Sequence, residues 1–202
     1  MDENDNQNKI EIKIITIGDS HVGKSSLIVK YIENRFSNTY LSTIGFDLKH
    51  KQITLKDGNQ ARLTIFDTAG QERFRSLAKN YLTKADGILL VYDISDENTF
   101  QSIGHWMESV TEQIGDKIPI ILIGNKSDLT EKRKVQTNEG KNRADEYGFP
   151  FYETSCKTGK NVNECFIELA ELVYRKRGNK ISQNSNQKLR KGSIKRKKKG
   201  CC

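Results

Sequence analysis

The chain has 202 residues, a length suited to one domain with an ordinary hydrophobic core. Its formal net charge of +8 is unevenly distributed, because the residues from Arg175 onward include twelve Lys and Arg and no acid. That leaves 22 basic against 26 acidic residues in the body, which is therefore slightly acidic. A basic strip at one end suits an anionic membrane, nucleic acid or nuclear import, and charge alone does not choose among them.

Targeting signals and cysteines narrow the cellular setting. The longest apolar runs, residues 87–92 and 118–123, are far too short to span a bilayer. The acidic, polar start has neither the apolar stretch of a secretory signal nor the Gly at position 2 that myristoylation needs. Cys156 and Cys165 form no CxxC pair and have no His cluster beside them. We therefore expect a cytosolic protein in which these two thiols are reduced.

The first part of the chain predicts a strand, a glycine-rich turn, a helix and a hairpin. Residues 9–17 alternate and then become apolar, and residues 24–34 carry apolar side chains at helical spacing. Residues 46–55 and 61–66 alternate on either side of Asp57-Gly58, which is a hairpin turn signal. The hairpin predicts an antiparallel pair at one edge of a sheet.

The rest of the chain alternates strands with helices. Strands are predicted near residues 87–93, 119–124 and 150–154, and helices near residues 97–113, 136–147 and 161–175. This alternation predicts an α/β fold with a mostly parallel sheet, helices on both faces and ligands at the carboxyl ends of the strands. We predict a disordered N-terminus at residues 1–8, one domain at residues 9–175, and a disordered tail at residues 176–202 that is too polar to order itself.

A phosphate-binding loop follows the first strand. Gly18 to Ser25 fits the pattern G-x-x-x-x-G-K-[ST] between a strand and a helix, a context that weighs against an incidental glycine turn. Its glycines let backbone N–H groups wrap phosphates, Lys24 reaches the terminal phosphates, and Ser25 ligates Mg²⁺. The residues predicted to line it are Gly18, Asp19, Ser20, His21, Val22, Gly23, Lys24, Ser25 and Ser26. The motif predicts a nucleoside phosphate and leaves the base open.

The base is read from Asn125-Lys126-Ser127-Asp128, which follows the strand at residues 120–124. Guanine offers its N1–H and its 2-amino group side by side, and the Asp128 carboxylate can accept both hydrogen bonds. Adenine would leave that carboxylate unpaired, and such sites reject the wrong partner by on the order of 10⁴. Asn and Asp also make ordinary turns, so the position after a strand gives this motif its weight. The sequence predicts guanine.

Further segments occur in the order found in Ras-like GTPases. They are Phe36, Ser42-Thr43-Ile44-Gly45, Asp67-Thr68-Ala69-Gly70-Gln71-Glu72, and Ser155-Cys156-Lys157 after the last strand. The resemblance spans about residues 9–175. It implies the P-loop GTPase fold, with a mostly parallel six-stranded sheet, one antiparallel edge pair and helices on both faces.

The resemblance also implies roles for individual residues. Thr43 and Asp67 would join Ser25 in holding Mg²⁺, and Gly70 would contact the γ-phosphate. Gln71 would orient the attacking water, with Lys24 and Thr43 also in the catalytic set. The residues implied around the guanine are Phe36, Asn125, Lys126, Asp128, Ser155, Cys156 and Lys157. The ligands implied are GTP or GDP with Mg²⁺.

Hydrolysis without help is expected to be slow. Arg73 and Arg75 follow Gln71 in a segment expected to move, and no other basic residue stands ready in cis to stabilise the transition state. By analogy with Ras, the rate would be on the order of 10⁻⁴ to 10⁻³ s⁻¹ until an activating protein accelerates it. Loss of the γ-phosphate would release Thr43 and Gly70, and partners would read the change.

Several segments resemble the Rab branch in particular. They are residues 44–48, 71–76 and 90–94, and the terminal pair Cys201-Cys202. The resemblance implies geranylgeranyl groups on Cys201 and Cys202, vesicle traffic at the cytoplasmic face of intracellular membranes, and a cytosolic pool. It implies a monomer whose partners are an exchange factor, a GTPase-activating protein, effectors, a GDP dissociation inhibitor and the prenylation machinery, with no nucleic acid. The effector-reading residues implied are Ile44, Gly45, Phe46, Leu48, Phe66 and Tyr81.

The sequence departs from the Rab pattern at a few positions, and two other functions compete with a GTPase switch. His21 is bulkier than the residue many relatives carry, Cys156 stands in place of Ala, and Leu48 and Phe66 stand where Rab proteins usually carry Phe and Trp. A nucleotide-locked scaffold and a nucleic-acid-binding ATPase are the competing functions. The first conflicts with the intact catalytic set, and the second conflicts with Asp128 and with a basic tail that lacks aromatic residues.

Overall fold

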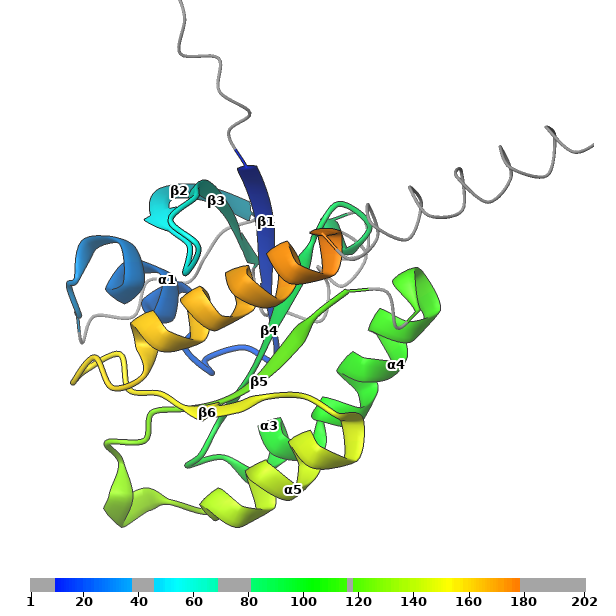
Figure 1. The fold of residues 1–202 in the computed structure, drawn as a ribbon. Helices are drawn as coiled ribbons and strands as arrows, with labels where there is room; N and C mark the ends of the chain where they lie inside the picture. Colours follow the sequence, from blue (N-terminus) through cyan, green and yellow to red (C-terminus); the bar gives the residue numbers. More distant parts are fainter. Residues whose placement is uncertain (1–9, 38–45, 69–80, 116–117, 179–202) are drawn as a thin grey trace, which may run out of the picture.

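The structure is a computed structural model that describes residues 10–37, 46–68, 81–115 and 118–178. Its centre is a six-stranded sheet in the order β2-β3-β1-β4-β5-β6. The strands are β1 Ile10–Ile17, β2 Phe46–Thr54, β3 Gln60–Thr68, β4 Gly87–Asp93, β5 Ile120–Asn125 and β6 Phe151–Glu153. Strands β2 and β3 pair antiparallel at one edge, and the other neighbours pair parallel. This confirms the predicted sheet (Figure 1).

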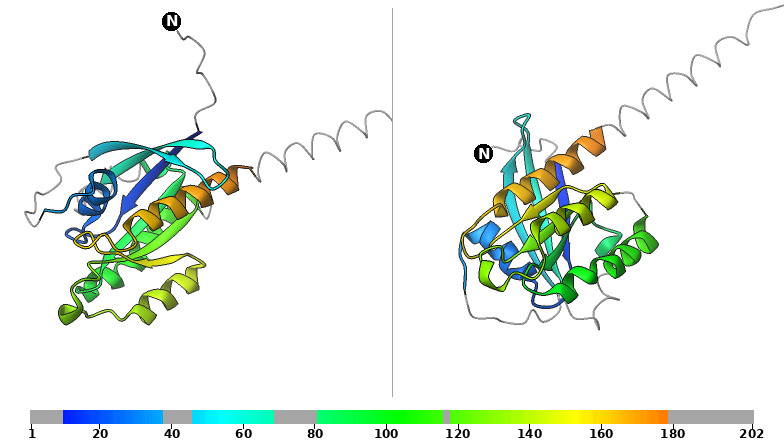
Figure 2. Two further views of the ribbon diagram at one scale, coloured as in Figure 1. Left: turned by 60° about the vertical axis from the view of Figure 1, so that its left-hand side comes forward. Right: turned by 90° about the horizontal axis from the view of Figure 1, so that it is seen from below.

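Helices cover both faces of the sheet (Figure 2). They are α1 Lys24–Glu33, α3 Glu97–Gln101, α4 Ile103–Ile114, α5 Thr137–Tyr147 and a last helix at residues 162–178. The cluster under α1 and the last helix includes Leu27, Ile28 and Phe166. The cluster on the opposite face includes Trp106 from α4 and Ala144 from α5. The sheet therefore separates two hydrophobic cores.

The central strand β4 explains why both faces need cover. Every residue of Gly87–Asp93 is buried. Leu89 and Val91 belong to one core, whereas Ile88 and Leu90 belong to the other. Successive side chains of a strand point to opposite faces, so an uninterrupted apolar run requires helices on both sides.

The structure corrects the predicted helices in three places. The helix predicted at residues 97–113 is two helices that meet at Ser102, whose hydroxyl and backbone N–H both donate to the Asn98 carbonyl. A serine hydroxyl that competes for a backbone carbonyl in this way disturbs helix continuity. A short 3₁₀ helix at Thr130–Lys132, which was not predicted, follows β5. The last helix continues to residue 178.

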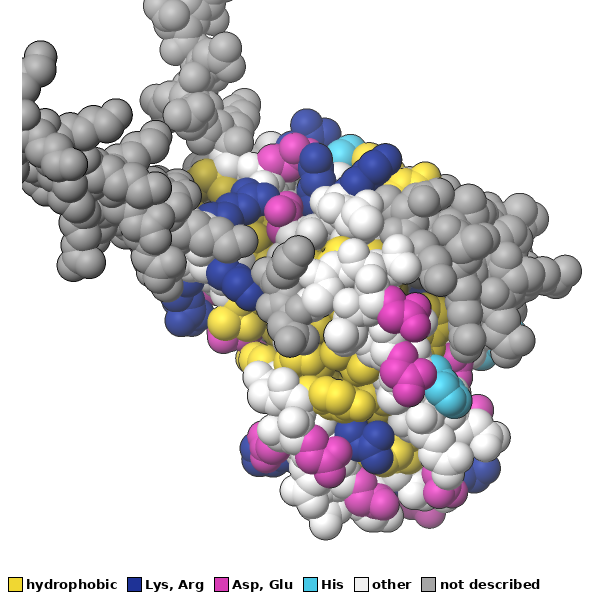
Figure 3. Space-filling view, turned by 90° about the vertical axis from the view of Figure 1, so that its right-hand side faces the viewer, with side chains coloured by type: hydrophobic (Ala, Val, Ile, Leu, Met, Phe, Trp, Pro, Cys, Tyr) yellow, Lys and Arg dark blue, Asp and Glu magenta, His cyan; other side chains and the backbone are white. Residues whose placement is uncertain are grey.

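The surface of the described body carries charges of both signs. On the face in Figure 3, basic and acidic side chains are interspersed around a strip of hydrophobic ones, as expected of a body with nearly balanced charge. No helix within the described ranges is long and apolar enough to cross a membrane. Residues 1–8 and the end of the tail, with Cys201 and Cys202, lie outside the described residues.

Candidate functional site

The phosphate-binding loop runs from β1 to α1 and requires its two motif glycines. Gly18 has φ 140°, and a Cβ there would lie 2.1 Å from the Val91 carbonyl oxygen of β4. Gly23 has φ 97°, and a Cβ there would lie 2.4 Å from Nδ2 of Asn125. Both positions combine a left-handed backbone with a close approach that only glycine allows. The loop is therefore pressed against the carboxyl ends of β4 and β5.

Lys24 begins α1 and is buried at the centre of this loop. Its Nζ donates to the carbonyl oxygens of Gly18, at 3.0 Å, and Asp19, at 2.7 Å. Burial lowers the pKa of Lys24 to about 8, although the charges of Asp67 and Asp19 act in the opposite direction. A buried ammonium group that has carbonyl partners and remains near the loop N–H groups suits a polyphosphate.

Asp67 lies near the end of β3 and is buried beside Lys24 and Ser25. Burial raises the pKa of Asp67, while a hydrogen bond with Ser25 and the charge of Lys24 lower it. Its buried Oδ1 has no hydrogen-bond partner. An unsatisfied buried carboxylate oxygen next to a hydroxyl is a donor set that fits a hard divalent cation such as Mg²⁺. Thr43, the third predicted ligand, lies outside the described residues.

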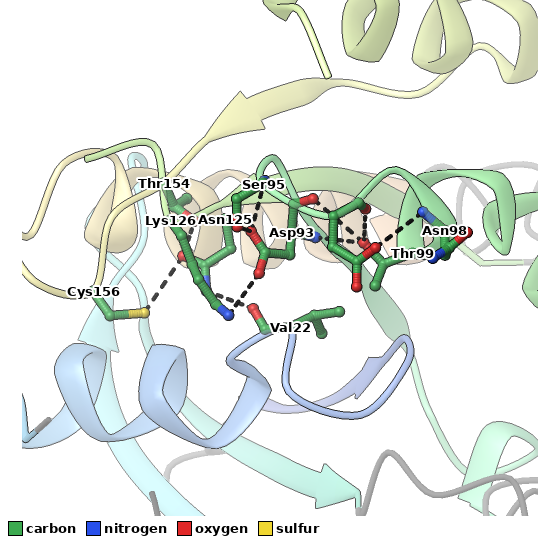
Figure 4. A network of polar contacts seen from close by, with 10 residues as sticks. Val22, Asp93, Ser95, Asn98, Thr99, Asn125, Lys126, Thr154 and Cys156 are labelled. Atoms are coloured by element: carbon green, nitrogen blue, oxygen red, sulfur yellow. Dashed lines mark hydrogen bonds and ion pairs between the residues drawn. The ribbon is translucent and has the colours of Figure 1, made fainter. Parts of the chain in front are cut away.

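Asn125 ends β5 and connects two loops (Figure 4). Its buried Nδ2 donates to the Val22 carbonyl oxygen at 2.8 Å. Its Oδ1 accepts from the Thr154 hydroxyl at 3.0 Å and from the Cys156 thiol at 3.5 Å. One side chain thus fixes the phosphate-binding loop against the loop that follows β6.

The predicted base-reading residues lie around this connection. The Asp128 carboxylate accepts a hydrogen bond from Ser155 Oγ at 2.6 Å. Lys126 has φ 64°, and its Nζ lies 2.6 Å from Oδ2 of Asp93. Cys156 is a buried free thiol whose pKa is raised to about 11, chiefly by burial. It suits a packing role rather than a reactive one.

Other predicted nucleotide-site residues lie nearer the surface. Ser20 and Ser26 are partly buried, and Lys157 is exposed. His21 is exposed and has φ 65°, an uncommon conformation for a residue other than glycine. The Phe36 ring is 41% exposed. Gly70 and Gln71 lie outside the described residues.

The predicted effector-reading residues differ in exposure. Leu48 on β2 is 40% exposed, whereas its cross-strand partner Phe66 on β3 is only 6% exposed. The Phe66 ring packs against Tyr81, with ring centroids 5.8 Å apart. Phe46 begins β2, and Ile44 and Gly45 lie outside the described residues.

Several contacts at the site were not predicted from the sequence, and three of them involve residues that the sequence analysis did not place in the site or did not pair. Asp93 pairs with Lys126, Thr154 donates to Asn125, and Trp106 Nε1 donates to Oδ1 of Asp19 at 2.8 Å. The position of Asp93 at the end of a buried parallel strand was a usable signal, because ligand-binding groups gather there. Trp106 lies on α4, far from the loop in sequence, and no local pattern marks it.

Comparison with known proteins agrees with this geometry. The family model described as Ras family matches residues 13–175. The chain belongs to the Ras family, whose members bind guanine nucleotides and hydrolyse GTP.

Relatives place the chain more closely, among the Rab proteins. It is 44% identical to Ras-related protein Rab-13 of Canis lupus familiaris over 175 residues, which is 87% of this chain and 86% of that protein. It is 42% identical to Ras-related protein SEC4 of Saccharomyces cerevisiae over 197 residues, 95% of this chain and 91% of that protein. It is 46% identical to Ras-related protein Rab-8B of Dictyostelium discoideum over 165 residues, 82% and 81% of the two chains. It is thus a Rab-type small GTPase, a GTP-dependent switch in vesicle traffic, as its sequence indicated.

Proposed function

We propose that the chain binds one guanine nucleotide with Mg²⁺ at the carboxyl ends of β1, β3 and β5, and that membrane-bound partners read which nucleotide is present. The observation that carries the proposal is the Asn125 side chain, which bonds to Val22 in the phosphate-binding loop and accepts from Thr154 beside the base-reading loop. Because one buried amide joins both loops, the phosphates and the base of a single nucleotide are bound in a fixed relation.

Guanine recognition is assigned to Asp128. Its carboxylate is oriented by Ser155 Oγ, and a carboxylate keeps further lone pairs that can accept from the guanine N1–H and 2-amino groups. The exposed Phe36 ring and the stem of Lys126 pack on the base, and the Cys156 N–H faces the guanine O6. Asn125 and Lys157 complete this part of the site.

Phosphate and metal binding are assigned to the buried polar groups around Lys24. The loop from Gly18 to Ser25 wraps the phosphates, and Ser25, Asp67 and Thr43 hold Mg²⁺. When bound, Mg²⁺ neutralises charge that develops on the phosphate oxygens. Gln71 orients the attacking water, and Gly70 and Thr43 respond to the γ-phosphate. Hydrolysis is slow until a GTPase-activating protein accelerates it.

Partner and membrane contacts complete the proposal. An exchange factor loads GTP, effectors bind the loaded form, and a GDP dissociation inhibitor and the prenylation machinery handle the tail that ends in Cys201 and Cys202. Effector contact on the hairpin rests on Leu48 more than on Phe66, since the Leu48 side chain is far more exposed. The protein acts as a monomer at the cytoplasmic face of intracellular membranes, with a cytosolic pool.

Single-turnover hydrolysis tests the switch. The wild type should convert one bound GTP to GDP slowly, whereas Gln71→Leu removes the polar group that orients water and should be slower by on the order of a hundredfold. GTP affinity, measured alongside, should remain nearly unchanged. If the variant hydrolyses GTP as fast as the wild type, Gln71 is not part of the catalytic set. If the wild type binds GTP and never turns it over, the locked-scaffold alternative holds.

A further inference from the structure

Asp93 is a buried carboxylate beside the nucleotide site to which the proposed function gives no task. It is the last residue of β4 and is 6% exposed. Its Oδ1 accepts from the backbone N–H of Ser95, at 2.8 Å, and from the Ser95 hydroxyl, at 2.7 Å. Its Oδ2 lies 2.6 Å from Nζ of Lys126 (Figure 4). One oxygen therefore fixes the orientation of the carboxylate, and the other pairs with a cation from β5's following loop.

The backbone of Asp93 is fixed as firmly as its side chain. Its N–H donates to the Thr99 hydroxyl at 3.0 Å, and that hydroxyl donates to the Asp96 carbonyl oxygen at 2.7 Å. Asp96 is the N-cap of α3 and accepts from the Asn98 N–H. The carboxylate is thus anchored to both the sheet and the start of a helix, and it forms a rigid partner for a flexible side chain.

Lys126 needs such a partner to hold a single conformation. A free lysine side chain loses much rotamer freedom when it is ordered, and Lys126 also adopts a left-handed backbone at φ 64°. Its side chain is 32% exposed, whereas that of Asp93 is 8% exposed, so the pair is shielded on the Asp93 side. An ion pair that is partly withdrawn from water is stronger than one on the open surface.

We propose that Asp93 is a positioning residue for nucleotide binding: it holds the Lys126 ammonium, so that the stem of Lys126 is aligned for the face of the base before the nucleotide arrives. The inference rests on the proposed packing of Lys126 against guanine. A side chain already ordered in its bound conformation loses less entropy when the ligand binds. Asp93 therefore slows nucleotide release without touching the nucleotide.

The first test removes the charge of Asp93 and keeps the shape of its side chain. Asp93→Asn retains an oxygen for Ser95 but presents Lys126 with a neutral amide. In the full-length protein, release of fluorescently labelled GDP should become about tenfold faster or more, because differences in affinity among variants of one site appear mostly in the dissociation rate. Wild-type and variant release at the same rate would overturn the inference, while failure of the wild type to bind GDP would instead overturn the proposed function.

The matched control lies at the opposite end of the same strand. Asp86 just precedes β4; its Oδ2 accepts from the Lys13 N–H at 2.8 Å and its Oδ1 pairs with Arg177 at 2.5 Å. Asp86→Asn should lower the unfolding temperature and leave GDP release unchanged. Thermal unfolding of both variants separates loss of stability from loss of positioning. Equal acceleration of release by both substitutions would mean that any weakened ion pair on β4 loosens the site, and the inference would fail.

A double-mutant cycle shows whether Asp93 acts through Lys126. Lys126→Met keeps an apolar stem and removes the ammonium, so adding Asp93→Asn to it should accelerate release little further. If Asp93→Asn accelerates release by the same factor in both backgrounds, Asp93 acts through the Ser95 turn and not through Lys126.

Inosine diphosphate gives a second readout, because it lacks only the 2-amino group of the guanine base. Asp93→Asn should speed its release by the same factor as GDP, since the stem packs on the ring face.

Discussion

The two ends of β4 use similar chemistry for different purposes. At the amino end, Asp86 accepts the Lys13 N–H and pairs with Arg177, which joins β1 to the last helix. At the carboxyl end, Asp93 accepts from Ser95 and pairs with Lys126, which belongs to the base-reading segment. The Asp86–Arg177 pair ties the last helix to the sheet, and the Asp93–Lys126 pair orders a side chain of the proposed ligand site. Topology explains the difference, because the loops that follow parallel strands all gather at the carboxyl edge.

Buried polar side chains also differ between the carboxyl and the amino ends of the strands. Those at or near the carboxyl ends include Lys24, Asp67, Asp93, Asn125 and Ser155, and one of them, Asp67, keeps an unsatisfied oxygen. At the other end, buried Glu171 is satisfied by the Lys56 N–H at 2.6 Å. Buried polar groups without partners destabilise a fold. Among the described residues, Asp67 Oδ1 and Ser127 Oγ are both buried without a hydrogen-bond partner at the carboxyl edge, where a bound ligand can supply one.

The largest expected effect is on membrane attachment, which should be lost without any change at the nucleotide site. The last helix ends near the amino edge of the sheet, where Arg177 donates to the Glu11 carbonyl at 2.6 Å, so the last described residues lie at the edge opposite the proposed nucleotide site. A prenyl chain contributes about 0.8 kcal/mol for each buried CH₂, whereas basic residues contribute about 1 kcal/mol each and are screened by salt. Replacing Cys201 and Cys202 with Ser should abolish sedimentation with membranes in high salt and leave GTP hydrolysis intact.

The control keeps the cysteines and neutralises the basic run. Replacing Lys197, Lys198 and Lys199 with Ala should alter which membranes the protein prefers more than whether it binds. If the double Ser variant still sediments to the same extent, prenylation is not the anchor and the tail requires a protein or nucleic-acid partner.

Gly23→Ala should have the next largest effect, because it disturbs the carboxyl edge directly. The new Cβ would meet Nδ2 of Asn125 at 2.4 Å and displace the amide that joins the two loops. The affinity for GDP should fall by about tenfold or more, because a buried polar group left without its partner costs about 1–3 kcal/mol. Gly58→Ala is a matched control, since Gly58 has φ 88° and nothing within 4 Å of its would-be Cβ. It should cost about 1 kcal/mol of stability and leave GDP affinity unchanged.

Arg177→Ala should have the smallest effect and should act at the amino edge alone. It removes the pair with Asp86 and the hydrogen bond to Glu11, both at a partly exposed site. The free energy of unfolding should fall by about 1 kcal/mol or less. GDP affinity should not change, and a tenfold loss of affinity would contradict the separation of the two ends. Chemical denaturation and fluorescent-GDP titration measure the two quantities.

The sequence predicted the strands and the motifs, but it did not predict the contacts between distant segments. The run at residues 87–92 identified β4 because a buried parallel strand is uninterruptedly apolar. The break at Ser102 was not predictable, since it depends on where one hydroxyl finds a carbonyl. The motif at Asn125 predicted a guanine site, but its bond to Val22 joins segments far apart in sequence. Such contacts depend on strand register and cannot be seen in either segment alone.

The most direct test of the central claim is competition for the nucleotide site. The Asp128 carboxylate, which accepts from Ser155 Oγ at 2.6 Å, should favour guanine. GTP should therefore displace labelled GDP from the wild type, and ATP should compete more weakly than GTP by a factor on the order of 10⁴. Asp128→Asn should reverse the preference toward xanthosine triphosphate, whose 2-oxo group accepts from the new amide. If ATP displaces labelled GDP from the wild type as readily as GTP does, the carboxyl edge of this sheet is not a guanine site.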